Sequence, residues 1–247
     1  MALSVTVLGS SGSYASVDNP CSGYLLRSEG ATVLLDCGPG TLGPLQEHVA
    51  PSELSAIVLT HCHPDHWLEL PVMRNVLKYF DPAQGVPVYG TACTRDMDMS
   101  VTLPSPHHPD PFEWKIIDGS SCLDIGDLRL RFATTDHPVE TLAVRVDHEG
   151  RSFACSSDSG PAWSFRSLGD DLDVAFADAS HLSTLEGRGI PHMSAREAGH
   201  NGRESGVGRL VLTHLVPGSD PDAHRTEAAA AYGGPVDVAL AGCTFDI

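Results

Sequence analysis

A chain of 247 residues, 41% of them hydrophobic, can bury a core of its own, and we expect residues 1–247 to form a single domain. No apolar stretch is long enough to cross a bilayer, and residues 1–9 lack the basic start of a signal peptide, so the sequence predicts no membrane segment. The formal net charge of −17 disfavours extended nucleic-acid binding, because the phosphates carry the same sign.

The hydrophobic pattern of the first half predicts strands at residues 3–8, 22–27, 31–36, 56–60 and 87–89. The second and third of these are expected to pair as a hairpin. Helices are predicted at residues 41–49 and 68–80, with Pro71 tolerated in the first turn of the latter. Four prolines in residues 104–111 predict an irregular loop at the rim of a site.

The second half alternates in the same way. Strands are predicted at residues 114–117, 128–133, 142–146, 152–155, 173–178, 209–213 and 236–240. Ser194 and Glu197 match a capping box that begins a helix over residues 195–206, and Gly233 is expected to end a helix over residues 221–232. The seven cysteines are odd in number and scattered, which predicts reduced thiols and a cytoplasmic protein.

The densest chemical pattern follows the strand at 56–60 and reads His61-Cys62-His63-Pro64-Asp65-His66. Four ligand-type side chains in six positions after a buried strand indicate a metal centre. Alternation along an extended segment places His61 and His63 on one side, where both imidazoles can reach one ion. Pro64 turns the chain, and Asp65 and His66 are then free to face a second ion.

Further ligands are expected at the ends of distant strands, and the candidates are His137, Asp158 and His214. One ion would bind His61, His63 and His137, a second would bind Asp65, His66 and His214, and Asp158 would bridge them. Nitrogen and carboxylate ligands of this kind suit two zinc ions, and also manganese or iron. Residues 57–61 and 210–214 both end an apolar run in Thr-His, so each half of the chain delivers a histidine from a strand end.

This ligand set, in this order, resembles that of the metallo-β-lactamase fold superfamily over nearly the whole chain. The resemblance implies a four-layer αββα sandwich, an α+β fold of two pseudo-symmetric halves, with the site at one edge between two sheets. Asp36 matches the early aspartate of that superfamily, which supports the metal-binding loop and is not usually a ligand.

The long interval from Asp158 to His214, with His192 just before a capped helix, resembles the RNase Z-like phosphodiesterase branch. The similarity is greatest to its short bacterial members, including actinobacterial-type cyclic-nucleotide phosphodiesterases. The basic arm of true tRNA-processing enzymes has no counterpart here. Their His-Glu-Ala-Thr segment corresponds to residues 177–180, where the His–Glu pair is missing. Relatives of this branch are often dimers, so the resemblance also admits a homodimer.

We therefore expect a dinuclear metal-dependent hydrolase that uses a metal-bridging hydroxide on a small phosphodiester, with a 3′,5′-cyclic nucleotide as one candidate. Asp65 would orient the hydroxide and His192 would protonate the leaving oxygen, unless His192 only packs at the helix entry. The alternatives are thioester or lactone hydrolysis, as in glyoxalase II-like relatives, tRNA 3′-end processing, and metal binding without catalysis. Other histidines, including His181 and His224, have no sequence context that assigns them a role.

Overall fold

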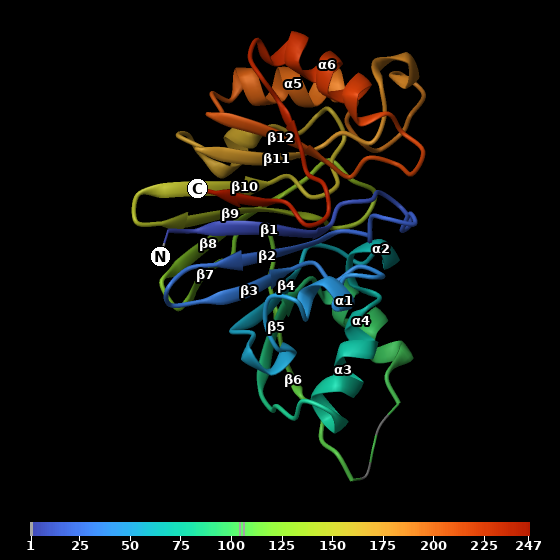
Figure 1. The fold of residues 1–247 in the computed structure, drawn as a ribbon, viewed down its shortest axis with the longest axis vertical. Helices are drawn as coiled ribbons and strands as arrows, with labels where there is room; N and C mark the ends of the chain where they lie inside the picture. Colours follow the sequence, from blue (N-terminus) through green and yellow to red (C-terminus); the bar gives the residue numbers. More distant parts are fainter. Residues whose placement is uncertain (1, 104, 106) are drawn as a thin grey trace.

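The computed structural model of the chain describes residues 2–103, 105 and 107–247; positions 104 and 106 of the predicted rim loop lie outside this range. Within the described residues, two seven-stranded sheets face each other, and helices cover the outer side of each (Figure 1). Helices α1 to α4 lie on one side and α5 and α6 on the other. The predicted four-layer αββα sandwich is confirmed.

The first sheet has the strand order β14-β1-β2-β3-β4-β5-β6. The expected hairpin is present as the antiparallel pair β2 and β3, and the strands from β3 to β6 run parallel. The strands are β1 (Ser4–Gly9), β2 (Gly23–Arg27), β3 (Thr32–Leu35), β4 (Ala56–Leu59), β5 (Val86–Gly90), β6 (Phe112–Ile116) and β14 (Thr244–Asp246).

The second sheet has the order β13-β12-β11-β10-β9-β8-β7. Its strands from β7 to β10 are antiparallel neighbours, whereas β10 to β13 are parallel. The strands are β7 (Cys122–Ile125), β8 (Leu128–Thr134), β9 (Leu142–His148), β10 (Arg151–Cys155), β11 (Val174–Asp178), β12 (Arg209–Thr213) and β13 (Asp237–Val238).

The helices are α1 (Leu42–Leu45), α2 (Pro64–Trp67), α3 (Leu70–Tyr79), α4 (Ala92–Val101), α5 (Ala195–Glu204) and α6 (Pro221–Tyr232), with short 3₁₀ turns η1 (Pro51–Glu53), η2 (Phe165–Leu168) and η3 (Ser183–Leu185). The capping box is present at α5, where the Ser194 side chain accepts from the Glu197 amide. Gly233 ends α6 with a φ of 85°, in the left-handed region that favours glycine. In the described part of the chain, none of the helices combines the length and apolar character needed to cross a membrane.

Some elements differ from the sequence prediction. The helix expected over residues 41–49 is only the short α1, and the sequence pattern did not predict α4, β7 or β14. Helix α4 is hard to find because it buries Thr94 and Asp98 while exposing Met97 and Met99. An inverted pattern of this kind does not produce the apolar stripe by which a surface helix is predicted.

The largest apolar core lies between the two sheets and includes Val33 and Val58 from the first and Phe153 and Phe176 from the second. Two further clusters fill the spaces between each sheet and its helices. This packing fixes the sheets relative to each other. The carboxyl ends of β3 and β4 in one sheet thereby come close to those of β10, β11 and β12 in the other, and the predicted ligand residues follow these ends.

Candidate metal centre

The Asp36 side chain contacts and positions the segment that carries the histidine cluster. Its Oδ1 accepts the Thr60 amide at 2.8 Å and its Oδ2 accepts the Thr60 hydroxyl at 3.0 Å. The same Oδ2 lies 2.8 Å from Nδ1 of His66. Pro64 then starts α2 at a position where its missing N–H is not needed. Asp36 thus joins both ends of the segment that presents the four candidate ligands.

A first group of potential ligand atoms consists of His61, His63, His137 and Asp158, all within 4.8 Å of one another. His63 Nδ1 lies 3.0 Å from His137 Nε2. Asp158 Oδ2 lies 3.5 Å from His61 Nε2 and 3.8 Å from His137 Nε2. These are the residues that the sequence analysis assigned to the first ion, together with the bridging aspartate.

A second group consists of Asp65, His66 and His214, again within 4.8 Å. The Nε2 atoms of the two histidines are 3.4 Å apart, and Asp65 Oδ2 lies 3.3 Å from His214 Nε2. Asp158 reaches this group with its other oxygen: Oδ1 is 3.1 Å from His66 Nε2 and 3.3 Å from His214 Nε2. The two groups therefore meet at one carboxylate, which offers one oxygen to each.

Buried atoms without a well-aligned hydrogen bond and free histidine lone pairs make this set of side chains suitable for divalent cations. His61 Nε2 and Asp158 Oδ1 are buried and form no well-aligned hydrogen bond with the described residues, although imidazole nitrogens lie 3.1 and 3.3 Å from Asp158 Oδ1. Buried polar atoms are otherwise nearly always satisfied, so a ligand is expected there. Outside the groups, His66 Nδ1 and His137 Nδ1 lie within hydrogen-bond distance of Asp36 and of the Pro191 carbonyl. Donation from these Nδ1–H groups leaves both Nε2 lone pairs free for a cation.

The electrostatics of the centre favour bound positive charge. Burial lowers the pKa of His61 to about 4, so its imidazole is neutral and able to ligate. Burial would raise the pKa of Asp158, but the surrounding histidines hold it well below its usual range. The same carboxylate raises the pKa of His66 and of His214 against the effect of their burial. A buried carboxylate surrounded by imidazoles is thus kept ionised.

The backbone is strained around this centre. Four non-glycine residues next to the ligands or among them have left-handed φ angles: Ser13 (65°), Asp36 (60°), Ser157 (51°) and His214 (61°). Such conformations cost about 1–3 kcal/mol each and gather at functional sites. At Ser13 this conformation accompanies a contact with a candidate ligand, since the Ser13 amide donates to Asp65 Oδ2 at 2.8 Å.

His192 also lies at the centre, although not within the first group. Its ring stacks on His214, with centroids 5.1 Å apart, and it lies 5.2 Å from the ring of His137. Its Nδ1 is 2.7 Å from Oδ2 of the buried Asp178. Burial would lower the pKa of His192, but the Asp178 carboxylate outweighs this and raises it to about 9. The Asp178 carboxylate therefore favours the protonated form of His192.

Asp178 also lies at the centre, although the sequence analysis assigned it no role. It belongs to residues 177–180, the segment in which the expected His–Glu pair is missing. The carboxylate at the second position of that segment is nevertheless retained as Asp178, and it closes on His192 from the end of β11. The carboxylate at this position was the feature from which the sequence could have indicated a role for Asp178.

Gly38 sets the position of α2, and its replacement gives a direct test. A Cβ at this position would lie 2.0 Å from the carbonyl oxygen of Asp65 and 2.7 Å from Cβ of Cys21. We expect Gly38→Ala to displace the turn that carries Asp65 and His66 and to weaken metal binding by about 10- to 100-fold, as measured by competition with a chelating dye. Gly43→Ala is the matched control, because its Cβ meets nothing within 4 Å. Equal metal affinity in the two variants would contradict this account.

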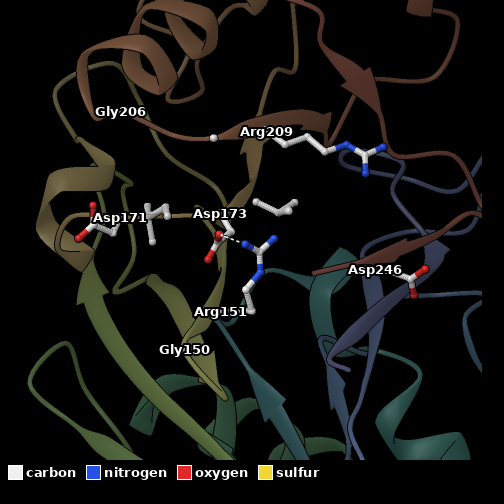
Figure 2. A pocket seen from close by; sticks show the side chains of 10 residues that line it. Gly150, Arg151, Asp171, Asp173, Gly206, Arg209 and Asp246 are labelled. Atoms are coloured by element: carbon white, nitrogen blue, oxygen red, sulfur yellow. Dashed lines mark ion pairs between the residues drawn. The ribbon is translucent and has the colours of Figure 1, made fainter. Parts of the chain in front are cut away.

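Two cavities of similar size differ in their relation to the centre. One of ≈ 540 Å³ has His192, Ser13 and Ser180 in its lining. The other, of ≈ 560 Å³, lies at the opposite ends of β10, β11 and β12, where these strands begin (Figure 2). Its Arg151 pairs with Asp173 at 2.6 Å, and its Arg209 pairs with Asp237 at 2.8 Å. Both cations are thus neutralised, and we expect substrate at the first cavity.

The sequence model described as the Beta-lactamase superfamily domain matches residues 31–215. The crystal structure of the metallo-β-lactamase fold protein YhfI from Bacillus subtilis superposes with a TM-score of 0.90 at 26% identity, over 100% of both chains. The chain belongs to the metallo-β-lactamase superfamily.

Relatives from three bacteria refine this assignment. The ML1173 protein of Mycobacterium leprae is 32% identical over 98% of this chain and 88% of its own. YhfI, named a probable metallo-hydrolase, is 28% identical over 99% of this chain and 100% of its own. A ribonuclease Z of Mycobacterium bovis is 29% identical over 96% of this chain and 95% of its own. The predicted RNase Z-like relationship is confirmed, as is a metal-dependent hydrolase at the level of the family.

Proposed function

We propose that this protein is a two-metal phosphodiesterase acting on a small substrate, with a 3′,5′-cyclic nucleotide as the favoured class. The observation that carries the proposal is the placement of Asp158, whose two oxygens face two separate groups of histidines. His61, His63 and His137 would hold one ion, and Asp65, His66 and His214 the other. Zinc suits these ligands best, and manganese and iron are the alternatives.

When bound, two such ions supply an activated water and stabilise charge on the phosphoryl oxygens. The side chains of the chain do the rest. Asp65 has its Oδ2 fixed by the Ser13 amide, while its Oδ1 makes no hydrogen bond to the described residues and is available to orient the attacking water. His192, whose protonated form the Asp178 carboxylate favours, is placed to donate a proton to the leaving oxygen.

A small substrate agrees with the charge and with the cavity. The net charge of −17 repels a polyanion, and the cavity beside His192 has a volume of ≈ 540 Å³. The similarity to ribonuclease Z makes tRNA processing the competing phosphodiester reaction.

A cytoplasmic location belongs to the same proposal and is supported by seven free cysteines. Homodimerisation is also proposed and can be checked by light scattering.

A panel of substrates tests the function. The purified protein, loaded with zinc or manganese, is assayed on bis(p-nitrophenyl) phosphate, 3′,5′-cyclic nucleotides, a glutathione thioester and a precursor tRNA. We expect turnover of the small phosphodiesters and little of the thioester. Faster turnover of the thioester would favour a glyoxalase II-like activity, and salt-dependent tRNA cleavage would overturn the argument from charge. Inactivity of metal-loaded protein on the whole panel would point to metal binding without catalysis.

The role of His192 gives a prediction that depends on the leaving group. We expect His192→Ala to lower kcat for a cyclic nucleotide by about 10²- to 10⁴-fold, because an alkoxide needs a proton to depart. Bis(p-nitrophenyl) phosphate should be much less affected, since its phenolate leaves without one. His48→Ala, at an exposed position, is the control. If His192 only packs at the start of α5, both substrates will lose activity by the same factor.

A further inference from the structure

The cavity beside His192 borders the proposed centre. Its lining includes Ser13, whose amide bonds Asp65, and Ser180, whose hydroxyl lies 3.1 Å from Nδ1 of His214. Its volume of ≈ 540 Å³ falls in the range of roughly 300–1,000 Å³ that small-molecule sites occupy. A phosphodiester held at the centre would therefore place one of its substituents in this cavity.

The walls of the cavity select a neutral, apolar group. Branched aliphatic side chains supply much of the lining: Leu182, Leu185, Ile190 and Val216. No lysine or arginine is among the lining residues that the structure describes, and Asp220 adds negative charge. A second phosphate or a polyanion would find no cation to pair with there. A flat, uncharged ring fits such walls, because its faces need only apolar contact.

Two buried histidines interrupt this apolar lining, and each has an unused ring nitrogen. His224 is 2% exposed and His181 is 7% exposed. His224 Nε2 and His181 Nδ1 have no hydrogen-bond partner among the described residues. A buried polar atom without a partner is unfavourable, so a bound group that satisfies it is favoured. Neither histidine could be assigned a role from the sequence.

The hydrogen bonding of His224 defines what it can recognise. Its Nδ1 lies 2.9 Å from the backbone carbonyl of Asp220, to which only an N–H can donate. In the neutral ring Nε2 is then a hydrogen-bond acceptor. The group that it binds must present a donor, such as the N–H of an amino substituent on an aromatic heterocycle.

Resting on the proposed function, we propose that this cavity is the subsite for the nucleobase of the substrate and that His224 Nε2 accepts a hydrogen bond from an amino-bearing base such as adenine. The aliphatic walls would contact the faces of the base, and His181 would offer a second polar contact. His224 is thus a specificity residue, distinct from the residues that surround the two ions.

The test compares three phosphodiesters: adenosine 3′,5′-cyclic monophosphate, the purine riboside analogue that lacks the amino group, and bis(p-nitrophenyl) phosphate, which has no base. In the unmodified protein we expect kcat/KM to be about 10-fold higher with the amino group than without it, the effect of one satisfied buried hydrogen bond. His224→Asn, which can still donate to the Asp220 carbonyl, should remove this preference, whereas bis(p-nitrophenyl) phosphate, which has no amino donor, reports any general loss of activity.

His224→Gln, which can place an oxygen near the position of Nε2, should retain much of the preference, and His200→Asn at an exposed position should retain all of it. Calorimetric binding of adenosine and of purine riboside gives the same comparison without turnover. Equal values for the two nucleosides and the two cyclic nucleotides would overturn the subsite while leaving phosphodiesterase activity intact. Absence of any phosphodiester turnover, with adenosine still preferred in binding, would instead defeat the proposed function alone.

Discussion

Replacing Asp158 by alanine is expected to abolish hydrolysis and metal binding together. One oxygen of this buried carboxylate lies 3.1 Å from His66 Nε2, and the other lies 3.5 Å from His61 Nε2. Its loss removes the group that the two ligand sets share and leaves several imidazoles close together without a compensating charge. We expect kcat/KM for bis(p-nitrophenyl) phosphate to fall by about 10⁴-fold or more, and metal analysis to find less than one ion per chain.

Matched variants separate the charge of Asp158 from its volume. Asp158→Asn keeps the shape without the charge and should lose activity in the same way. His63→Ala removes a ligand from the first group alone, so activity should be lost and metal released while His66 and His214 remain in place. Asp170→Ala, at an exposed position, should behave like the unmodified protein. Two retained ions and full turnover in Asp158→Ala would refute the shared-ligand arrangement.

Replacing Asp98 by alanine is expected to destabilise the fold by about 3–5 kcal/mol. Asp98 is fully buried on α4 and accepts a hydrogen bond from Arg74 Nη1 at 2.9 Å and from Trp114 Nε1 at 3.2 Å. Arg74 is itself 3% exposed, so the variant leaves a buried guanidinium with only the partly exposed Asp110 as an ion partner. Urea unfolding of the purified variant measures the loss.

The control for this prediction lies on the same helix. Asp96 pairs with Arg95 at 2.7 Å, but both side chains are exposed. Water screens such a pair, and Asp96→Ala should cost less than about 1 kcal/mol. The turnover per folded molecule should stay unchanged in both variants, because neither aspartate reaches the metal centre. Similar losses of stability in the two variants would show that Arg74 and Asp98 are not the buried pair described here.

The meeting of the candidate ligands could be predicted from the sequence, because it depends on few assumptions. His61, Asp158 and His214 each follow an apolar strand, and the carboxyl ends of parallel strands gather at one edge of a sheet. Knowing which residues end strands was therefore nearly enough to predict which of them meet. The sequence could not show which ring nitrogen of each histidine faces the first group. His63 turns its Nδ1 and His137 its Nε2 toward the group, and the packing of each ring decides this.

The features that escaped prediction depend on contacts between distant segments. Asp178 faces His192 only because β11 pairs in parallel with both β10 and β12, which brings its end beside the centre. Helix α4 forms around the buried Asp98, so its inward face is polar and shows no apolar period. The expected helix at 41–49 has Gly43 and Pro44 near its start, and only α1 forms.

Because the candidate ligands come from the ends of strands in both sheets, the centre is complete only after the two halves of the chain have docked. In an unfolded or half-folded chain, the cluster at residues 61–66 does not have the Asp158 carboxylate and the His214 imidazole beside it. Cations that bind only the docked form stabilise it against unfolding. Each tenfold rise in free cation concentration above the dissociation constant adds about 1.4 kcal/mol per ion to the free energy of unfolding. The lifetime of the protein in a cell would then follow the local supply of divalent metal.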